Sequence, residues 1–186
     1  VHNAFPGGIP KGAAVEIDMA VAETTREIPG ELPDALRIRL TLAADGTARA
    51  TSHAFALQPK DTTWTLRIAQ TRLDSHDPLL RHKTSRRSVY EAARAEFTHP
   101  QADEVILLNE RREVCEGTIT NLFVERGDGL VTPPLNSGLL AGILRAEMIE
   151  SGEAREAVLM EADLRGAKTI FVGNSLRGLI QCKLTG

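Results

Sequence analysis

Residues 103–124 read DEVILLNERREVCEGTITNLFV and hold two strand-like segments with an acidic residue between them. The apolar run at 104–108 predicts a buried strand, and residues 121–125 predict a second strand. Glu116 precedes a glycine between these segments, where an isolated acid is most often a turn or capping residue. This stretch therefore predicts a sheet with one carboxyl group close to its strands.

Helix-like and strand-like patterns alternate on both sides of this stretch. On the N-terminal side we expect a helix over 13–27, a β-hairpin of strands 36–42 and 47–51, a strand over 64–69 and a helix over 85–97. On the C-terminal side we expect strand 130–132, helix 138–150, and strands 157–159 and 169–172. The mixture predicts an α+β, or mixed α/β, fold with a largely non-parallel sheet.

The residues Gln58-Pro59-Lys60-Asp61 interrupt these patterns and predict a domain boundary near residue 60. We therefore expect a small N-terminal α/β domain over 1–60, which looks incomplete, and a larger C-terminal domain over 61–186.

The composition is that of a folded globular protein. Apolar residues make up 42% and charged residues 25% of the 186 residues, which argues against disorder. The net charge is -3 and the basic residues are dispersed, so neither nucleic acid nor an anionic membrane is an expected partner. The apolar runs are short and the secretory pattern is absent, so a cytoplasmic location is expected. Cys115 and Cys182 lack the spacing of metal ligands, and no metal site is expected.

Four segments carry residues suited to chemistry, and each has a commoner structural explanation when taken alone. They are the basic loop 81–87 with Lys83, the acid Glu116, the Pro-rich loop 132–138 before a helix, and the small polar residues at 172–175. Together they supply what pyridoxal phosphate chemistry requires: a lysine for the Schiff base, an acid for the pyridine nitrogen and backbone donors for the phosphate. The combination predicts a cofactor site.

The same segments resemble the class IV pyridoxal-phosphate enzymes, which include branched-chain aminotransferases, D-amino-acid aminotransferases and 4-amino-4-deoxychorismate lyases. The quoted stretch and the segments LLRHKTSRRSVYEAAR (79–94), LVTPPLNSGLLAGILR (130–145) and IFVGNSLRGLIQ (170–181) carry the resemblance. It implies a two-domain D-amino-acid aminotransferase-like fold that binds pyridoxal 5′-phosphate. The implied roles are the Schiff base for Lys83, the pyridine nitrogen for Glu116, the phosphate for Gly142, Ile143, Leu144, Asn174 and Ser175, and substrate contacts for Thr118, Arg87 and Arg177.

The chain departs from the family pattern at several positions. Arg86 stands where the family commonly has Asn, and Leu144 stands where it has Thr, so one hydroxyl contact to the phosphate is lost. The family's N-terminal phosphate-binding Arg has no counterpart in the sequence: either it precedes Val1 or the site lacks this phosphate ligand, and the start at Val rather than Met favours the first.

The resemblance implies a homodimer acting on a small molecule. The first hypothesis is an aminotransferase for a small amino acid and a 2-oxo acid. The second is a 4-amino-4-deoxychorismate lyase, which forms 4-aminobenzoate and pyruvate for folate synthesis. The third is a cofactor-free paralogue that serves as a binding module.

Overall fold

The computed structural model describes residues 24, 35–43, 45–127 and 129–186. The chain forms two compact units that divide between Pro59 and Lys60. In the smaller unit, β1 (Leu36–Leu42) pairs in antiparallel register with β2 (Ala48–Ala54), which confirms the expected hairpin. The helix expected over 13–27 lies outside the described residues, apart from Thr24.

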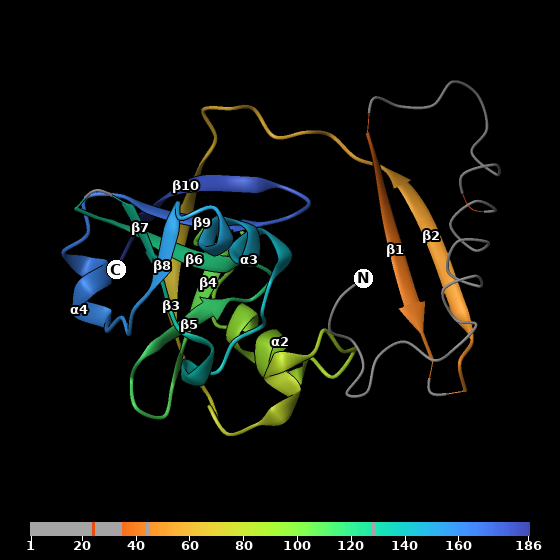
Figure 1. Ribbon diagram of the computed structural model, residues 1–186, viewed down its shortest axis with the longest axis horizontal. Helices are drawn as coiled ribbons and strands as arrows, with labels where there is room; N and C mark the ends of the chain where they lie inside the picture. Colours follow the sequence, from red (N-terminus) through yellow and green to blue (C-terminus); the bar gives the residue numbers. More distant parts are fainter. Residues whose placement is uncertain (1–23, 25–34, 44, 128) are drawn as a thin grey trace. The chain divides into compact units, whose positions relative to one another are not determined.

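The larger unit is built on one eight-stranded sheet (Figure 1). Its strands are β3 (Thr63–Leu73), β4 (Glu104–Asn109), β5 (Val114–Gly117), β6 (Asn121–Arg126), β7 (Gly129–Thr132), β8 (Ala154–Glu156), β9 (Ile170–Asn174) and β10 (Gly178–Leu184). They lie in the order β5-β4-β3-β10-β9-β6-β7-β8. The pairs β3–β4, β3–β10 and β7–β8 are parallel and the other pairs antiparallel, so the fold is mixed α+β.

The two edges of this sheet approach each other. The Val114 N–H of β5 donates to the Leu159 carbonyl at 2.7 Å, and Glu113 forms a β-bridge with Met160 just beyond β8. These contacts satisfy backbone groups that an open edge would leave unpaired. The sheet is therefore curled, and residues 157–160 connect its edges.

Strand β4 is buried on both faces because each face of the sheet is covered. Ile106 points into an apolar cluster with Leu66, Leu122 and Val172, whereas Val105 and Leu107 point into a second cluster on the opposite face. The second cluster includes residues of α2 (Ser88–Ala95) and of the 3₁₀ turn η1 (Pro78–Arg81). A third cluster packs α3 (Ile143–Glu150) against β6 and β8.

Several expected elements have different bounds. Helix α2 begins at Ser88 rather than at 85, because Arg87 has non-helical backbone angles. Helix α3 begins at Ile143 rather than at 138: residues Leu135–Ser137 form the 3₁₀ turn η2, which ends at Gly138 with a left-handed φ of 90°.

The prediction of a strand at 157–159 is wrong. Strand β8 occupies Ala154–Glu156, where backbone pairing with β7 overrides a sequence that lacks β-branched residues. Strand β10 and the short helix α4 (Glu161–Arg165) were not expected from the sequence.

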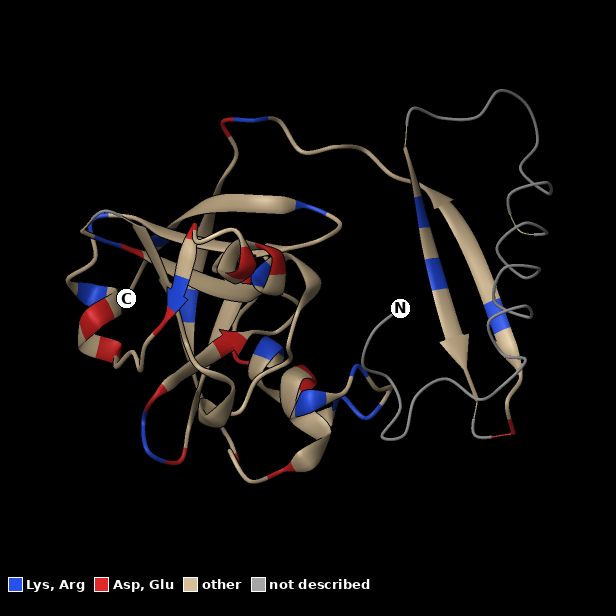
Figure 2. Ribbon diagram, viewed as in Figure 1, with Lys and Arg blue, Asp and Glu red and all other residues tan. Residues whose placement is uncertain are grey.

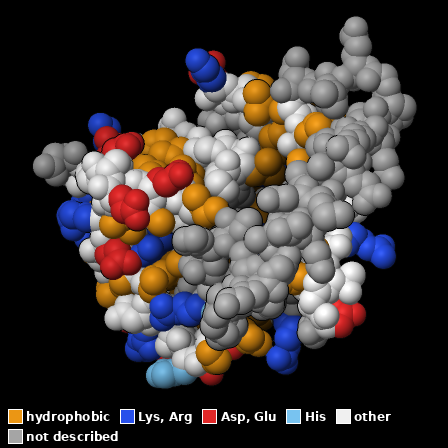
Figure 3. Space-filling model, turned by 45° about the vertical axis from the view of Figure 1, so that its right-hand side comes forward, with side chains coloured by type: hydrophobic (Ala, Val, Ile, Leu, Met, Phe, Trp, Pro, Cys, Tyr) orange, Lys and Arg blue, Asp and Glu red, His pale blue; other side chains and the backbone are white. Residues whose placement is uncertain are grey.

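Charged residues of both signs are interspersed along the ribbon of the larger unit (Figure 2). The face in Figure 3 also mixes apolar, basic and acidic side chains. Within the described part of the chain, every helix is too short or too polar to cross a bilayer.

Gly173 in β9 marks a close approach of three segments. A Cβ atom there would lie 2.6 Å from the Gly178 carbonyl oxygen and 2.8 Å from Leu144 Cδ2. Such separations require the backbone or the Leu144 side chain to move. Gly129 in β7 is different, because the nearest atom to an added Cβ is 3.7 Å away.

We therefore predict that Gly173→Ala lowers the free energy of unfolding by about 1–3 kcal/mol through overpacking. Gly129→Ala is the matched control and should change it by less than about 0.5 kcal/mol. Urea unfolding of both variants measures the difference. Equal stabilities would show that the β9–β10 turn relaxes without strain.

Candidate active site

One cavity of about 300 Å³ gathers residues from four separate segments of the larger unit. The loop after η1 and helix α2 contribute Lys83, Arg86, Arg87 and Tyr90, and the end of β5 contributes Glu116 and the following loop. The loop before α3 and the β9–β10 turn complete its wall. Its size is at the lower end of the range for small-molecule sites.

Glu116 is the buried acid of this cavity, with 5% of its surface exposed. Its Oε1 accepts a hydrogen bond of 2.7 Å from the Tyr90 hydroxyl, and the backbone N–H of Leu140 also favours the charged form of its carboxyl group. Burial raises the pKa of Glu116 from 4.5 to about 8, although these donors and the charges of Lys83 and Arg87 favour the carboxylate. The cost of burying a charge on Glu116 is therefore only partly compensated, and a cationic ligand group beside it would stabilise the carboxylate.

The loop after Glu116 is held by a second buried acid, Glu104 at the start of β4. Its carboxylate accepts from both the N–H and the hydroxyl of Thr118, at 3.0 and 2.5 Å. It also accepts from the Ile119 N–H at 3.1 Å and from the Thr120 hydroxyl at 2.8 Å. These bonds fix three consecutive residues of the cavity wall.

Helix α3 points its N-terminus at the cavity. Gly142 is its N-cap residue and has no side chain with which to cap the first turn, and Gly142 and Ile143 both line the cavity. The N–H groups of a first helical turn lack helical partners, and they attract anions. Asn121 ties this loop to β6, because its Nδ2 donates to the Leu140 carbonyl at 2.9 Å.

The β9–β10 turn brings Asn174 and Ser175 to the same cavity. The Asn174 Nδ2 donates to the Ile119 carbonyl at 3.1 Å, and its Oδ1 accepts from the N–H groups of Leu176 and Arg177. The side chain of Asn174 thus joins the turn to the loop after β5.

The structure brings most of the residues expected at the site together. Those that line the cavity are Lys83, Arg87, Glu116, Thr118, Gly142, Ile143, Asn174 and Ser175. Leu144 and Arg177 are not among the lining residues: Leu144 packs in the apolar cluster of α3, and the Arg177 guanidinium lies 5.7 Å from the centroid of the Trp64 ring. We therefore give Arg177 no substrate contact.

Two residues of the site, Tyr90 and Glu104, were not singled out from the sequence. The signal for Glu104 is an acid that begins an otherwise apolar strand, since such an acid must find donors once it is buried. The signal for Tyr90 is its position three residues after Arg87, because residues at that spacing lie on one face of a helix.

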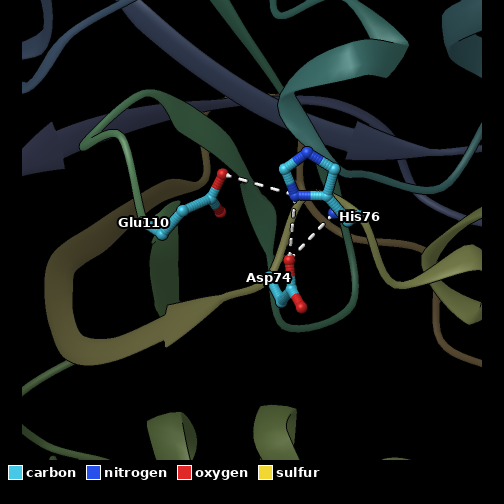
Figure 4. A group of neighbouring side chains, drawn as sticks. All are labelled: Asp74, His76 and Glu110. Atoms are coloured by element: carbon cyan, nitrogen blue, oxygen red, sulfur yellow. Dashed lines mark hydrogen bonds and ion pairs between the residues drawn. The ribbon is translucent and has the colours of Figure 1, made fainter.

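A separate group of side chains at the surface could in principle share a cation. The ligand atoms of Asp74, His76 and Glu110 lie within 4.8 Å of one another, and all three residues are exposed (Figure 4). Glu110 is already bound by the N–H and hydroxyl of Ser75, which lower its pKa to about 2, and by Arg111. These contacts connect the end of β3 to the β4–β5 turn, and we assign them a structural role.

The fold is that of a known family of enzymes. Residues 14–184 match the family model described as amino-transferase class IV. The chain therefore belongs to the class IV aminotransferase family.

Individual relatives include both aminotransferases and lyases. A solved structure from Mesorhizobium loti, assigned as an amino-acid aminotransferase, is 50% identical with a TM-score of 0.88, covering 92% of this chain and 82% of that one. A branched-chain aminotransferase from Thermoproteus uzoniensis, solved with norvaline, is 25% identical with a TM-score of 0.74, covering 93% and 64%. The aminodeoxychorismate lyase of Vibrio harveyi is 29% identical over 119 residues, which are 61% of this chain and 44% of the relative. The matched regions span between 30% and 46% of the length of four curated relatives.

The raised pKa of Glu116 predicts a pH dependence of stability in the cofactor-free protein. Between pH 4.5 and about 8 the folded chain keeps a proton on Glu116 that the unfolded chain has lost. The free energy of unfolding should therefore fall as pH rises through this window, with this group contributing at most about 1.4 kcal/mol per pH unit.

The Glu116→Gln variant should lack this contribution, so its stability relative to the wild type should improve from pH 5 to pH 8. Urea unfolding at several pH values measures both proteins. Parallel pH dependences would contradict the buried, neutral state of this acid.

Proposed function

We propose that residues 61–186 form a cofactor-binding domain in which Lys83 binds pyridoxal 5′-phosphate covalently. We further propose that the chain acts as a class IV aminotransferase on a small amino acid and a 2-oxo acid. The observation that carries this proposal is that Lys83 and Glu116 line the same cavity. An amine and a buried acid are the two side chains that the aldehyde and the ring nitrogen of the cofactor require.

The residues of the cavity fit the cofactor in charge as well as in position. Glu116 is buried with a pKa of about 8, so its carboxylate gains most from a protonated ring nitrogen. The first turn of α3 presents N–H groups where a phosphate would be stabilised. Leu140, whose backbone N–H lowers the pKa of Glu116, stands two residues before Gly142 in the chain.

Each residue then has a defined task. When bound, the cofactor withdraws electrons from the substrate carbon that carries the amino group. Lys83 Nζ removes a proton at that carbon and returns one later, acting as general base and then as general acid. Glu116 would hold a proton on the ring nitrogen, and the N–H group of Ile143, which lines the cavity at the start of α3, would hold the phosphate. The Arg87 guanidinium, which also donates to the Thr118 carbonyl, supplies positive charge for a substrate carboxylate.

Aminodeoxychorismate lyase activity is the second candidate, and the similarity to the Vibrio harveyi lyase supports it. That reaction would use the same lysine and acid and release 4-aminobenzoate and pyruvate, as in folate synthesis. The sequence identity of 50% to the Mesorhizobium loti protein, assigned as an amino-acid aminotransferase, favours aminotransferase activity.

We also propose that the chain works as a cytoplasmic homodimer. The support for the dimer is that Ile119 and Ile143, which line the cavity, are 48% and 47% exposed. A second subunit that covered these apolar side chains would remove them, and the cofactor, from water.

A product assay tests the proposed function. Purified protein supplied with pyridoxal phosphate should convert a panel of amino acids and 2-oxo acids, and Lys83→Ala should lower the rate at least about 100-fold because the general base is lost. Lys60→Ala is the matched control, since this exposed lysine lies outside the cavity, and it should retain the wild-type rate.

Formation of 4-aminobenzoate from aminodeoxychorismate, with no amino transfer, would replace the first candidate by the second. Neither product, together with no bound cofactor, would contradict both and favour a binding module.

A further inference from the structure

A hydrogen bond joins the two elements that carry the proposed cofactor residues. Tyr90 belongs to α2, which follows the Lys83 loop, and Glu116 belongs to β5. The Tyr90 hydroxyl donates to Glu116 Oε1 at 2.7 Å, and both residues line the cavity. The donor thus lies on the helix that follows the proposed Schiff-base lysine along the chain.

We propose that Tyr90 is a positioning residue that favours the ionised form of Glu116 and orients its carboxyl group toward the ring nitrogen, and that Arg87 holds Tyr90 in place. This inference rests on the proposed function, because it deepens the role given there to Glu116.

The guanidinium group of Arg87 lies over the aromatic ring of Tyr90. The guanidinium carbon lies 4.7 Å from the ring centroid, which is cation–π geometry, and Arg87 also donates to the Thr118 carbonyl. Thr118 is in turn fixed by Glu104. The orientation of the phenol is therefore set by the same loop that follows Glu116.

The charges and donors around Tyr90 and Glu116 determine whether losing the Tyr90 hydroxyl raises or lowers the pKa of Glu116. The charged and polar groups that act on Glu116 are Lys83 and Arg87, the Tyr90 hydroxyl and the Leu140 N–H, with Cys115 as its chain neighbour. Burial and the nearby Glu116 raise the pKa of Tyr90 well above its usual value, so Tyr90 remains a hydrogen-bond donor at every working pH. Burial likewise raises the pKa of the Cys115 thiol, so this neighbour stays neutral.

Loss of the phenol hydroxyl should favour the neutral acid. Burial already favours the protonated form of Glu116, and each donor to the carboxylate opposes it. A hydrogen bond to a charged group changes an equilibrium by roughly tenfold or more, which corresponds to about one pH unit or more. Once Glu116 is neutral, it no longer stabilises a proton on the ring nitrogen.

The test is a titration of the cofactor-free full chain labelled with ¹³C at the glutamate carboxyl groups. The Glu116 signal is assigned as the one missing from Glu116→Gln. In Tyr90→Phe, which keeps the ring and its packing, the pKa of Glu116 should rise by about one pH unit. Glu91→Gln is the matched control on the same helix, and it should leave this pKa unchanged because Glu91 is exposed and outside the cavity.

A second readout follows from the cofactor-loaded protein. The acidic limb of the pH dependence of kcat should move upward in Tyr90→Phe by the same amount as the pKa, while cofactor content stays at the wild-type level. Arg87→Lys keeps the charge but loses the flat guanidinium, and it should shift the pKa of Glu116 in the same direction by a smaller amount.

An unchanged pKa of Glu116 in a folded Tyr90→Phe variant would overturn the inference. Should Tyr90→Phe fail to fold, an unchanged pKa in Arg87→Lys would overturn it instead. Wild-type turnover in Glu116→Gln would contradict the proposed role of Glu116 itself, so the two failures are distinguishable.

Discussion

The buried carboxylate of Glu104 organises the part of the molecule on which the site depends. It receives five hydrogen bonds, one from its neighbour Val105 and four from Thr118, Ile119 and Thr120. An acid can be buried in this way only if the protein supplies all of its partners. The loop after β5 donates four of these hydrogen bonds, and they fix the conformation of the loop. Carbonyl groups of the same loop then accept from Arg87 on one side and Asn174 on the other, so three distant segments are held to one acid.

The buried acids Glu104 and Glu116 differ in how many hydrogen-bond donors surround them. Glu104 is saturated with donors from its own chain, whereas Glu116 has the Tyr90 hydroxyl and the Leu140 N–H and lines the cavity. Burial without full compensation raises the pKa of Glu116 to about 8, which suits an acid that gains its final partner from a ligand. One acid therefore stabilises the wall, and the other is the acid to which we assign the proposed chemistry.

The sequence predicted the strands better than the points at which chain segments meet. Apolar alternation identified β3, and short apolar runs identified β4, β6 and β9, because both patterns are local properties of the chain. Strand β8 was misplaced, since its pairing with β7 is made by backbone groups that leave no mark on Ala154–Glu156. The candidate site was found mainly through its resemblance to a family. Tyr90 and Glu104 were missed because their partners, Glu116 and the loop 118–120, lie 26 and 14–16 residues away along the chain.

Four chain segments converge on one cavity, and we propose that Lys83 binds pyridoxal phosphate there with Glu116 at the ring nitrogen. The most direct measurement is to incubate the protein with the cofactor, reduce it with borohydride and locate the modified lysine by peptide mass spectrometry. The lysines within the described residues are Lys60, Lys83, Lys168 and Lys183, and Lys83 alone among them lines this cavity. We expect the phosphopyridoxyl mass on Lys83. Modification at another lysine, or dispersed among several, would contradict it.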